Sequence, residues 1–249
     1  MPALVLPDLP SSYVSTRGAL QRVAVHVLAR RRHALVGKLG LRATPGGIGT
    51  PAAGPDHEVV RTSGPWLVRE RTGTTATTDV LDLRTATLGQ AAQLVEVDLS
   101  APFSAGHDTP EVGDPDAPLG IDGEAVAALA AWFAFGWRVL DEAVAGAGDP
   151  AGPTVVQLWP EHFDAGCDLG VGGGRRTNLG ASPGDGSSPE PYLYVGPWDA
   201  DRPGDPAYWN AGFGALLGYE ELRRAGDASA RAVEFLRAGL AHLSPGPTG

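Results

Sequence analysis

Glycine and proline place the strongest limit on how this chain can fold. They account for 35 and 22 of its 249 residues, more than a fifth of the sequence against a usual share of about 12%. Both residues interrupt helices and central strands, so the regular elements must be short and separated by turns, and a long coiled coil is excluded. The hydrophobic fraction of 43% is typical of globular proteins. We therefore expect a folded chain.

Residue usage is strongly biased. The chain has one lysine, Lys38, and two asparagines, Asn178 and Asn210, and a GC-rich coding sequence explains the scarcity of residues with A/T-rich codons. The single cysteine, Cys167, excludes an intrachain disulfide and a paired metal or redox motif. The N-terminal residues lack the basic region of a signal peptide, and no apolar run reaches the ~20 residues of a membrane span. The sequence therefore predicts a soluble cytoplasmic protein that does not bind membranes.

Charge is unevenly distributed along the chain. The formal net charge is -10, yet the first 50 residues contain seven basic side chains and one acid, Asp8. Such asymmetry can mark a nucleic-acid-binding arm, but these basic residues fall in a helix-like stretch with an apolar stripe and a single aromatic residue, Tyr13. We expect an amphipathic helix whose arginines face solvent or pair with the acidic second half, and no binding of nucleic acid.

Hydrophobic periodicity predicts an α+β protein. In the first half, a helix begins at Ser15 or Thr16 and ends near Arg32, with apolar residues at helical spacing. Antiparallel strands follow, because short alternating runs are separated by Pro-Gly and Gly-Pro turns. The predicted strands are residues 38–43, 58–62, 66–71 and 77–83, and a short helix is predicted at residues 88–94.

The stretch 100–121 contains four prolines and no lysine or arginine, which is typical of a linker or a long surface loop. After it, Asp122 caps a strongly apolar helix that ends near Ala145, and Asp227 opens a last helix that ends at Leu243. The strands predicted between these helices are residues 155–159, 168–171, 176–181 and 192–195. The expected organisation is residues 1–99, the linker 100–121 and residues 122–249, packed as one globular unit.

Similar strings of turn residues in the two halves of the chain predict an internal duplication. The string ATPGG at 43–47 leads to GPW at 64–66, and ASPGD at 181–185 leads to GPW at 196–198. We expect two halves, each a helix plus an antiparallel meander, related by duplication and followed by a C-terminal helix. In a chain this rich in glycine and proline, chance similarity of the two strings is the alternative.

The string LWPEHFD, residues 158–164, is the densest group of chemically versatile side chains. If the string is extended, His162 and Asp164 lie on one face, the spacing at which an imidazole and a carboxylate bind the same metal ion. Glu161 or Asp185 would then act as the base. The alternative is that Asp164 accepts a hydrogen bond from His162 or from a turn. The residues considered as a third metal ligand are Asp185, Glu190, Cys167, His107 and His242.

Two further segments offer side chains for binding a ligand. Asn178, in RTNLGASPGD, has an amide donor and acceptor beside a glycine-rich loop, although Asp185 in that loop is also typical of a residue that braces a turn. Tyr192 and Tyr194 share one face of a predicted strand and leave leucine and valine for the core. The candidates in the string YWNAGFG are Trp209 and Asn210.

The strings LWPEHFD, NxGASPGD and EPYLYVGPW resemble those of an uncharacterised family of conserved hypothetical proteins from GC-rich bacteria. The resemblance covers most of residues 17–70 and 122–222. It implies a soluble cytoplasmic protein, and it assigns no activity, cofactor or catalytic residue.

Three functions stay open at this point. The chain lacks a GxSxG nucleophile elbow, a phosphate-binding loop and a convincing dinucleotide fingerprint, so the sequence does not decide whether the protein is an enzyme or which cofactor it uses. The first function is that of a soluble small-molecule-binding protein, with or without catalysis, whose pocket lies in the second half. The second is a metal-dependent enzyme that uses His162 and Asp164. The third is a non-catalytic interaction module or a homo-oligomer.

Overall fold

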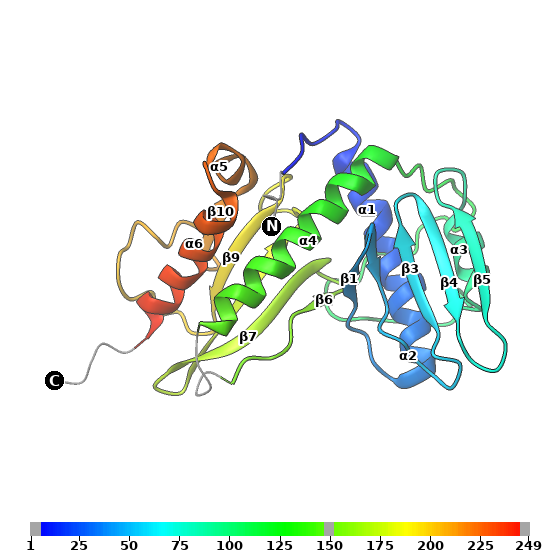
Figure 1. The fold of residues 1–249 in the computed structure, drawn as a ribbon, viewed down its shortest axis with the longest axis horizontal. Helices are drawn as coiled ribbons and strands as arrows, with labels where there is room; N and C mark the ends of the chain where they lie inside the picture. The colour runs from blue at the N-terminus through cyan, green and yellow to red at the C-terminus, as the bar shows by residue number, and fades with distance from the viewer. Residues whose placement is uncertain (1–5, 147–151, 245–249) are drawn as a thin grey trace. The chain divides into compact units, whose positions relative to one another are not determined.

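The structure, a computed structural model, describes residues 6–146 and 152–244. Within these residues the protein is α+β, with two antiparallel five-stranded sheets (Figure 1). Contacts divide the chain into two compact units. The N-terminal unit comprises Pro7–Phe133 and Gln157–Phe163, and the C-terminal unit comprises Met1–Leu6, Ala134–Val156 and Asp164–Gly249.

Three consecutive helical segments open the N-terminal unit: α1 (Tyr13–Val23), η1 (Ala24–Ala29) and α2 (Arg30–Val36). They confirm the predicted helix and extend it at both ends. The expected start is wrong, because Ser15 and Thr16 both lie inside α1 and Thr16 is fully buried. The middle segment is a π-helix whose residues are all buried, and Gly37, at a φ of 66°, ends the helix in the left-handed conformation that suits glycine.

The proline-rich stretch 100–121 is not an independent linker, because the helix of the N-terminal unit binds its backbone. Arg22, His26 and Arg30 follow one another at intervals of four residues, and each contacts a carbonyl oxygen of this stretch. The acceptors, in the same order, are the carbonyl groups of Val112, Pro110 and Ala101. The division of the chain into two units falls within the following helix, between Phe133 and Ala134.

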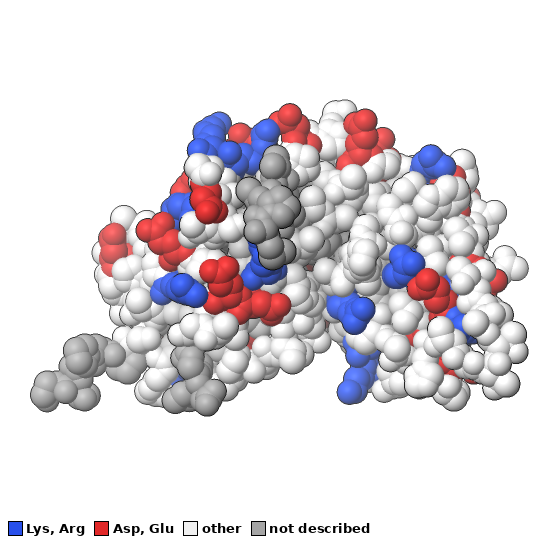
Figure 2. All heavy atoms as spheres, viewed as in Figure 1, with Lys and Arg blue, Asp and Glu red and all other residues white. Residues whose placement is uncertain are grey.

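The same contacts revise the interpretation of the basic N-terminal region. Arg22 and Arg30 bind backbone carbonyls of the N-terminal unit, and Arg31 pairs with Glu58 in the same unit. On the face drawn in Figure 2, basic side chains lie among uncharged residues and beside acidic ones. The absence of nucleic-acid binding stays a prediction.

The first sheet is a simple meander of neighbouring strands. Its strands are β1 (Arg42–Thr44), β2 (Gly47–Gly49), β3 (Val59–Ser63), β4 (Trp66–Arg71) and β5 (Thr77–Asp82), paired in that order. The Pro-Gly turn between β1 and β2 and the Gly-Pro turn between β3 and β4 are where the sequence predicts them. Helix α3 (Leu88–Leu94) follows, and it begins with a capping box formed by Thr87 and Gln90.

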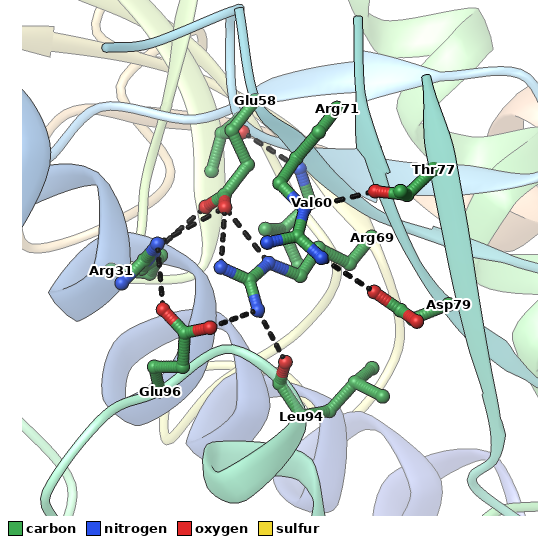
Figure 3. Close-up of polar contacts among 10 residues, drawn as sticks. Arg31, Glu58, Val60, Arg69, Arg71, Thr77, Asp79, Leu94 and Glu96 are labelled. Atoms are coloured by element: carbon green, nitrogen blue, oxygen red, sulfur yellow. Dashed lines mark hydrogen bonds and ion pairs between the residues drawn. The ribbon is translucent and has the colours of Figure 1, made fainter. Parts of the chain in front are cut away.

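A buried ion-pair network joins the first sheet to helix α2, which contains Arg31 (Figure 3). The Glu58 carboxylate lies 2.7 Å from Arg31 Nε and 2.7 Å from Arg69 Nη2. Arg69 also pairs with Glu96 at 2.9 Å and donates to the Leu94 carbonyl. Burial alone raises the pKa of Glu58, but hydrogen bonds and charge from the two arginines outweigh burial and lower that pKa below its ordinary value. The carboxylate is therefore held ionised inside the unit.

Helix α4 (Gly123–Ala145) confirms the strongest helix prediction. The Asp122 carboxylate accepts a hydrogen bond from the Ala125 N–H, as expected of an N-cap. The unit division falls after Phe133, so α4 contributes residues to both units. Among the described residues α4 is long and apolar enough to cross a membrane by length and composition, but more than half of its most apolar stretch is buried, as in the core helix of a soluble protein.

The second sheet also follows chain order. Its strands are β6 (Gln157–Trp159), β7 (Asp164–Gly172), β8 (Arg175–Ser182), β9 (Tyr192–Pro197) and β10 (Ala215–Gly218), in the order β10-β9-β8-β7-β6. The predicted hairpin around three glycines is confirmed, with Gly172 paired to Arg175. Two helices complete the C-terminal unit: α5 (Tyr219–Arg224) and α6 (Ala228–Leu243), the latter capped by Asp227.

The two meanders support the predicted halves without deciding whether they arose by duplication. Gly-Pro-Trp follows β3 in the first sheet and closes β9 in the second, and each of these strands then pairs with the next antiparallel strand. The Pro-Gly string, however, forms a tight hairpin between β1 and β2, whereas its counterpart opens a longer loop between β8 and β9. Duplication therefore stays a prediction.

We expect Glu58→Gln to destabilise the N-terminal unit by about 3 kcal/mol or more, because it leaves the buried Arg69 charge without its full partner. The matched control is Glu96→Gln in the same network. The Glu96 side chain is 60% exposed, so its loss should cost less than about 1 kcal/mol. Urea unfolding of both variants measures the difference, and equal losses would contradict a special role for Glu58.

We also expect His26 to make stability depend on pH. Burial lowers the pKa of His26, so the folded state binds this proton less readily than the unfolded state. Stability from this group is full above the unfolded pKa of ~6.5 and falls as pH drops toward the folded value, by at most about 1.4 kcal/mol per pH unit. Unfolding of the wild type and of His26→Gln between pH 7.5 and 5.5 tests this, and the variant should show the shallower slope.

Candidate functional site

The strands β7, β8 and β9 divide their side chains between two faces. Antiparallel pairing places Asp164 beside Ser182 and Tyr192, and it aligns the next rows at intervals of two residues. One face is apolar and is made of Ala165, Cys167, Leu169, Thr177, Leu179, Ala181, Leu193 and Val195. The opposite face, which we call the polar face, carries Asp164, Gly166, Asp168, Arg176, Asn178, Gly180, Ser182, Tyr192, Tyr194 and Gly196.

The apolar face is the core of the C-terminal unit. Helices α4 and α6 lie against it, closely enough that a Cβ atom on Gly136 would be 2.5 Å from Ala181 and one on Gly239 would be 2.8 Å from Val195. Cys167 lies on this face, and burial, followed by nearby carboxylates, raises the pKa of its thiol to about 12. A thiol with such a pKa is protonated near neutral pH, so Cys167 is not an activated nucleophile.

Two glycines on the polar face make room for the ring of Tyr194. Gly166, Gly180 and Tyr194 form one row across β7, β8 and β9. A Cβ atom on Gly180 would lie 2.2 Å from the Tyr194 ring, and one on Gly166 would lie 3.3 Å from its hydroxyl oxygen. The ring therefore lies flat across the neighbouring strands, and its hydroxyl donates to Oδ2 of the buried Asp164.

A second tyrosine–carboxylate pair lies beside the first. The Tyr192 hydroxyl donates to Asp185 Oδ2 at 2.6 Å, and Asp185 also accepts from the Ser187 N–H in its own turn. Burial is the main cause that raises the pKa of both Tyr192 and Tyr194, and the neighbouring carboxylates raise it further. Both phenols therefore stay protonated near neutral pH and act as hydrogen-bond donors.

Phe213 completes a compact group of three aromatic rings, which we call the ring cluster: Tyr192, Tyr194 and Phe213. The ring centroids are 6.2 Å apart between the tyrosines and 6.1 and 6.2 Å from each of them to Phe213. Phe213 is 37% exposed, whereas Tyr192 is 3% exposed. Sequence reasoning missed Phe213, although it lies in the same YWNAGFG string as two predicted residues.

At the other end of the polar face, away from Tyr192, the side chains of Asp168 and Asn178 contact Arg176 and Trp198. Arg176 pairs with Asp168 Oδ1, and the Trp198 indole donates to Asn178 Oδ1 at 3.1 Å. Asp168 Oδ2 is buried and has no hydrogen-bond partner among the described residues. The predicted Asn178 is exposed and so presents its amide to solvent from this face.

The string that contains His162 and Asp164 does not have the extended conformation that the predicted metal site assumes. Residues 160–163 form a turn rather than a strand, and Phe163 has a φ of 57°, so the two-residue period does not apply. His162 pairs instead with Asp108, with Nδ1 3.0 Å from Oδ2, and Asp108 also contacts His107 at 2.6 Å. No group of three His, Cys, Asp or Glu side chains within the described ranges is placed to hold a metal ion.

Glu161 and the two residues of the YWNAGFG string lie apart from the polar face. Glu161 belongs to the N-terminal unit, where its side chain is buried against Gly106. Asn210 donates to the Leu216 carbonyl and accepts from the Leu216 N–H, which extends the pairing of β10. The Trp209 indole donates to the Pro203 carbonyl. These contacts give Trp209 and Asn210 structural roles in the loop before β10.

A separate pocket of about 300 Å³ lies at the ends of α4, β7 and α6. Arg237 is the charged residue among those that line it, and Arg237 already donates to the Glu142 carbonyl. None of the predicted site residues lines it. Its lining residues Gly146 and Ser244 are each the last described residue before a segment that the structure does not describe.

No family model, curated protein or solved structure matches this chain. The resemblance found in the sequence strings stays a prediction, and the geometry of the residues carries the functional argument.

We expect Gly180→Ala to displace Tyr194 and break its bond to Asp164, because the added methyl group would occupy the position of the ring. A hydrogen bond to a charged group contributes about 1.5–3 kcal/mol, so the variant should lose stability in that range. Gly196→Ala is the matched control, since its Cβ would meet nothing nearer than 3.8 Å. Urea unfolding and near-ultraviolet circular dichroism of the tyrosines measure both effects. A loss as large in Gly196→Ala would contradict the packing argument.

Proposed function

We propose that the C-terminal unit binds a small organic molecule on the polar face of β7, β8 and β9. The observation that carries the proposal is the Tyr194–Asp164 pair, in which a carboxylate is buried on the side of the sheet away from the core. An antiparallel sheet commonly exposes solvated polar residues on that side. Burying a carboxylate there has a desolvation cost, and binding sites are where proteins typically tolerate such a cost.

The surrounding side chains supply the two kinds of contact that a small-molecule site needs. The ring cluster offers apolar surface, and Asp185 and Asn178 offer directional hydrogen bonds at its edges. Asn178, Tyr192 and Tyr194 sit on strands whose register fixes their spacing, which favours a preformed site. Whether the bound molecule also reacts is left open by this proposal.

The other two functions receive less support from the geometry. A metal-dependent enzyme built on His162 and Asp164 would need both side chains at one ion, but His162 pairs with Asp108 and Asp164 accepts a hydrogen bond from Tyr194. The interaction module would use an exposed aromatic strip. Trp198 is 63% exposed on the polar face, whereas the ring cluster is packed on itself.

Thermal-shift screening of metabolites on the full chain tests the proposal. A ligand present at 100 times its Kd stabilises the folded state by about 2.7 kcal/mol, which corresponds to roughly 5–10 °C in Tm for a chain of this size. We expect Tyr194→Phe or Asn178→Ala to reduce the shift. His162→Ala, in the other unit, is the control and should leave it unchanged. A shift that survives the first two substitutions and disappears in the control would place binding elsewhere.

A further inference from the structure

We propose that strand β5 (Thr77–Asp82) pairs with β5 of a second copy of this chain and so joins the first sheets of the two copies edge to edge. The two strands run antiparallel, with Val80 of one copy opposite Val80 of the other. This inference is independent of ligand binding at the polar face, because β5 belongs to the N-terminal unit. Its basis is the difference between β5 and the other sheet edges that the structure describes.

The other edges of the two sheets are protected. Within the described residues the edge strands are β1 and β5 in the first sheet and β6 and β10 in the second. Leu41, beside β1, exchanges two backbone hydrogen bonds of 2.8 Å with Leu158 in β6. On β10, the side chain of Asn210 bonds both the N–H and the carbonyl of Leu216. Proteins protect edges in such ways because an unpaired edge takes up another strand.

Strand β5, the last strand of the first sheet in Figure 1, turns backbone hydrogen-bonding groups away from the sheet. The Leu83 N–H donates to the Pro65 carbonyl at 2.9 Å, just beyond the pairing of β4 with β5. Bonded pairs alternate along an antiparallel ladder, so the N–H and carbonyl groups of Thr78, Val80 and Asp82 point away from β4. The Asp82 carbonyl is used by the turn that follows. No described residue bonds the outward backbone groups of Thr78 or Val80.

The side chains of β5 leave this edge open to another strand. Val80 is 54% exposed at the middle of the strand. Carboxylates on an edge strand can repel an incoming strand, but those of β5 are paired within the chain. Asp79 pairs with Arg71 at 3.3 Å. Asp82 pairs with Arg84 at 2.7 Å.

The sequence of β5 is complementary to itself, which is the reason for choosing a second copy as the partner. With Val80 opposite its own copy, residues 78–82 of both strands pair, and Val80 exchanges both N–H···O bonds with its counterpart. Asp79 then faces Leu81, and Asp82 faces Thr78, so no two carboxylates are opposed. A shift of two residues toward the start of the strand would place Asp79 opposite Asp79, and directly opposed like charges destabilise a strand pair. The twofold arrangement is closed, so it stops at a dimer.

Sedimentation velocity on the full chain tests the proposal. One strand pair buries less than the ~800 Å² per partner of a standard interface, so we expect a reversible monomer–dimer equilibrium with a Kd on the order of micromolar to hundreds of micromolar. Samples that span this range should shift from monomer to dimer and return to monomer on dilution. A chain that stays monomeric at the highest concentration would overturn the proposal.

One substitution tests whether the dimer uses this edge. Val80→Lys places two like charges opposite each other at the twofold axis, and we expect it to weaken dimerisation roughly tenfold or more. Val36→Lys is the matched control, because it adds the same charge at a 42% exposed valine on α2 of the same unit. Its Kd should equal that of the wild type. Equal weakening in both variants would contradict pairing through β5.

A cross-linking experiment tests the register, and it also decides the question if Val80→Lys folds poorly. In the proposed pair the two Cα atoms at position 80 lie ~5.5 Å apart, a separation that a disulfide spans. The two Cα atoms at position 78 lie four residues apart along the strands, ~13 Å. Under mild oxidation, Val80→Cys should form a covalent dimer on a non-reducing gel, and Thr78→Cys should stay largely monomeric. The native Cys167 is buried. A dimer that fails to cross-link through position 80, or that cross-links equally through both positions, would overturn the proposed register and the proposal with it.

Discussion

In-register pairing of β7, β8 and β9 is the constraint on which the C-terminal unit depends. Side chains on a strand alternate between faces, so a slip of one residue would move every apolar residue to the polar face and every carboxylate into the core. The row of Gly166, Gly180 and Tyr194 specifies this register further. A tyrosine ring can lie across two strands only where both neighbours lack a Cβ atom. Glycine is therefore used here for close approach and not for a turn.

The two units bury charge in different ways. In the N-terminal unit, Arg31 and Arg69 donate to both carboxylate oxygens of Glu58, so the charge is compensated within the protein. In the C-terminal unit, the carboxylates of Asp164 and Asp185 accept hydrogen bonds from the neutral phenol groups of Tyr194 and Tyr192. The first arrangement pairs opposite charges inside the unit, whereas the second uses neutral hydrogen-bond donors.

Much of the fold follows from local patterns in the sequence. The helix at 88–94 and the strand at 66–71 have the predicted bounds, because a capping box and a Gly-Pro turn act over a few residues. The expectation that the string 158–164 is extended was wrong, also for a local reason. The turn at 160–163 requires Phe163 in a left-handed conformation that is uncommon for non-glycine residues, and the packing of its ring 5.5 Å from Phe133 offsets that cost. No pattern in the string itself reveals this contact.

The sequence by itself determined the α+β class, most of its helices and strands in their order, and the sharing of one face by Tyr192 and Tyr194, because hydrogen-bonding period and turn chemistry are local properties. It did not predict the short strands β2 and β10 or the short helix α5. Only the tertiary structure decided which distant residues meet. Phe213 joins the two tyrosines from a loop 19 residues beyond Tyr194, and Asp108 reaches His162 from a proline-rich stretch held by the first helix. Such contacts depend on how whole elements pack, and packing is a sum over many residues that no single motif records.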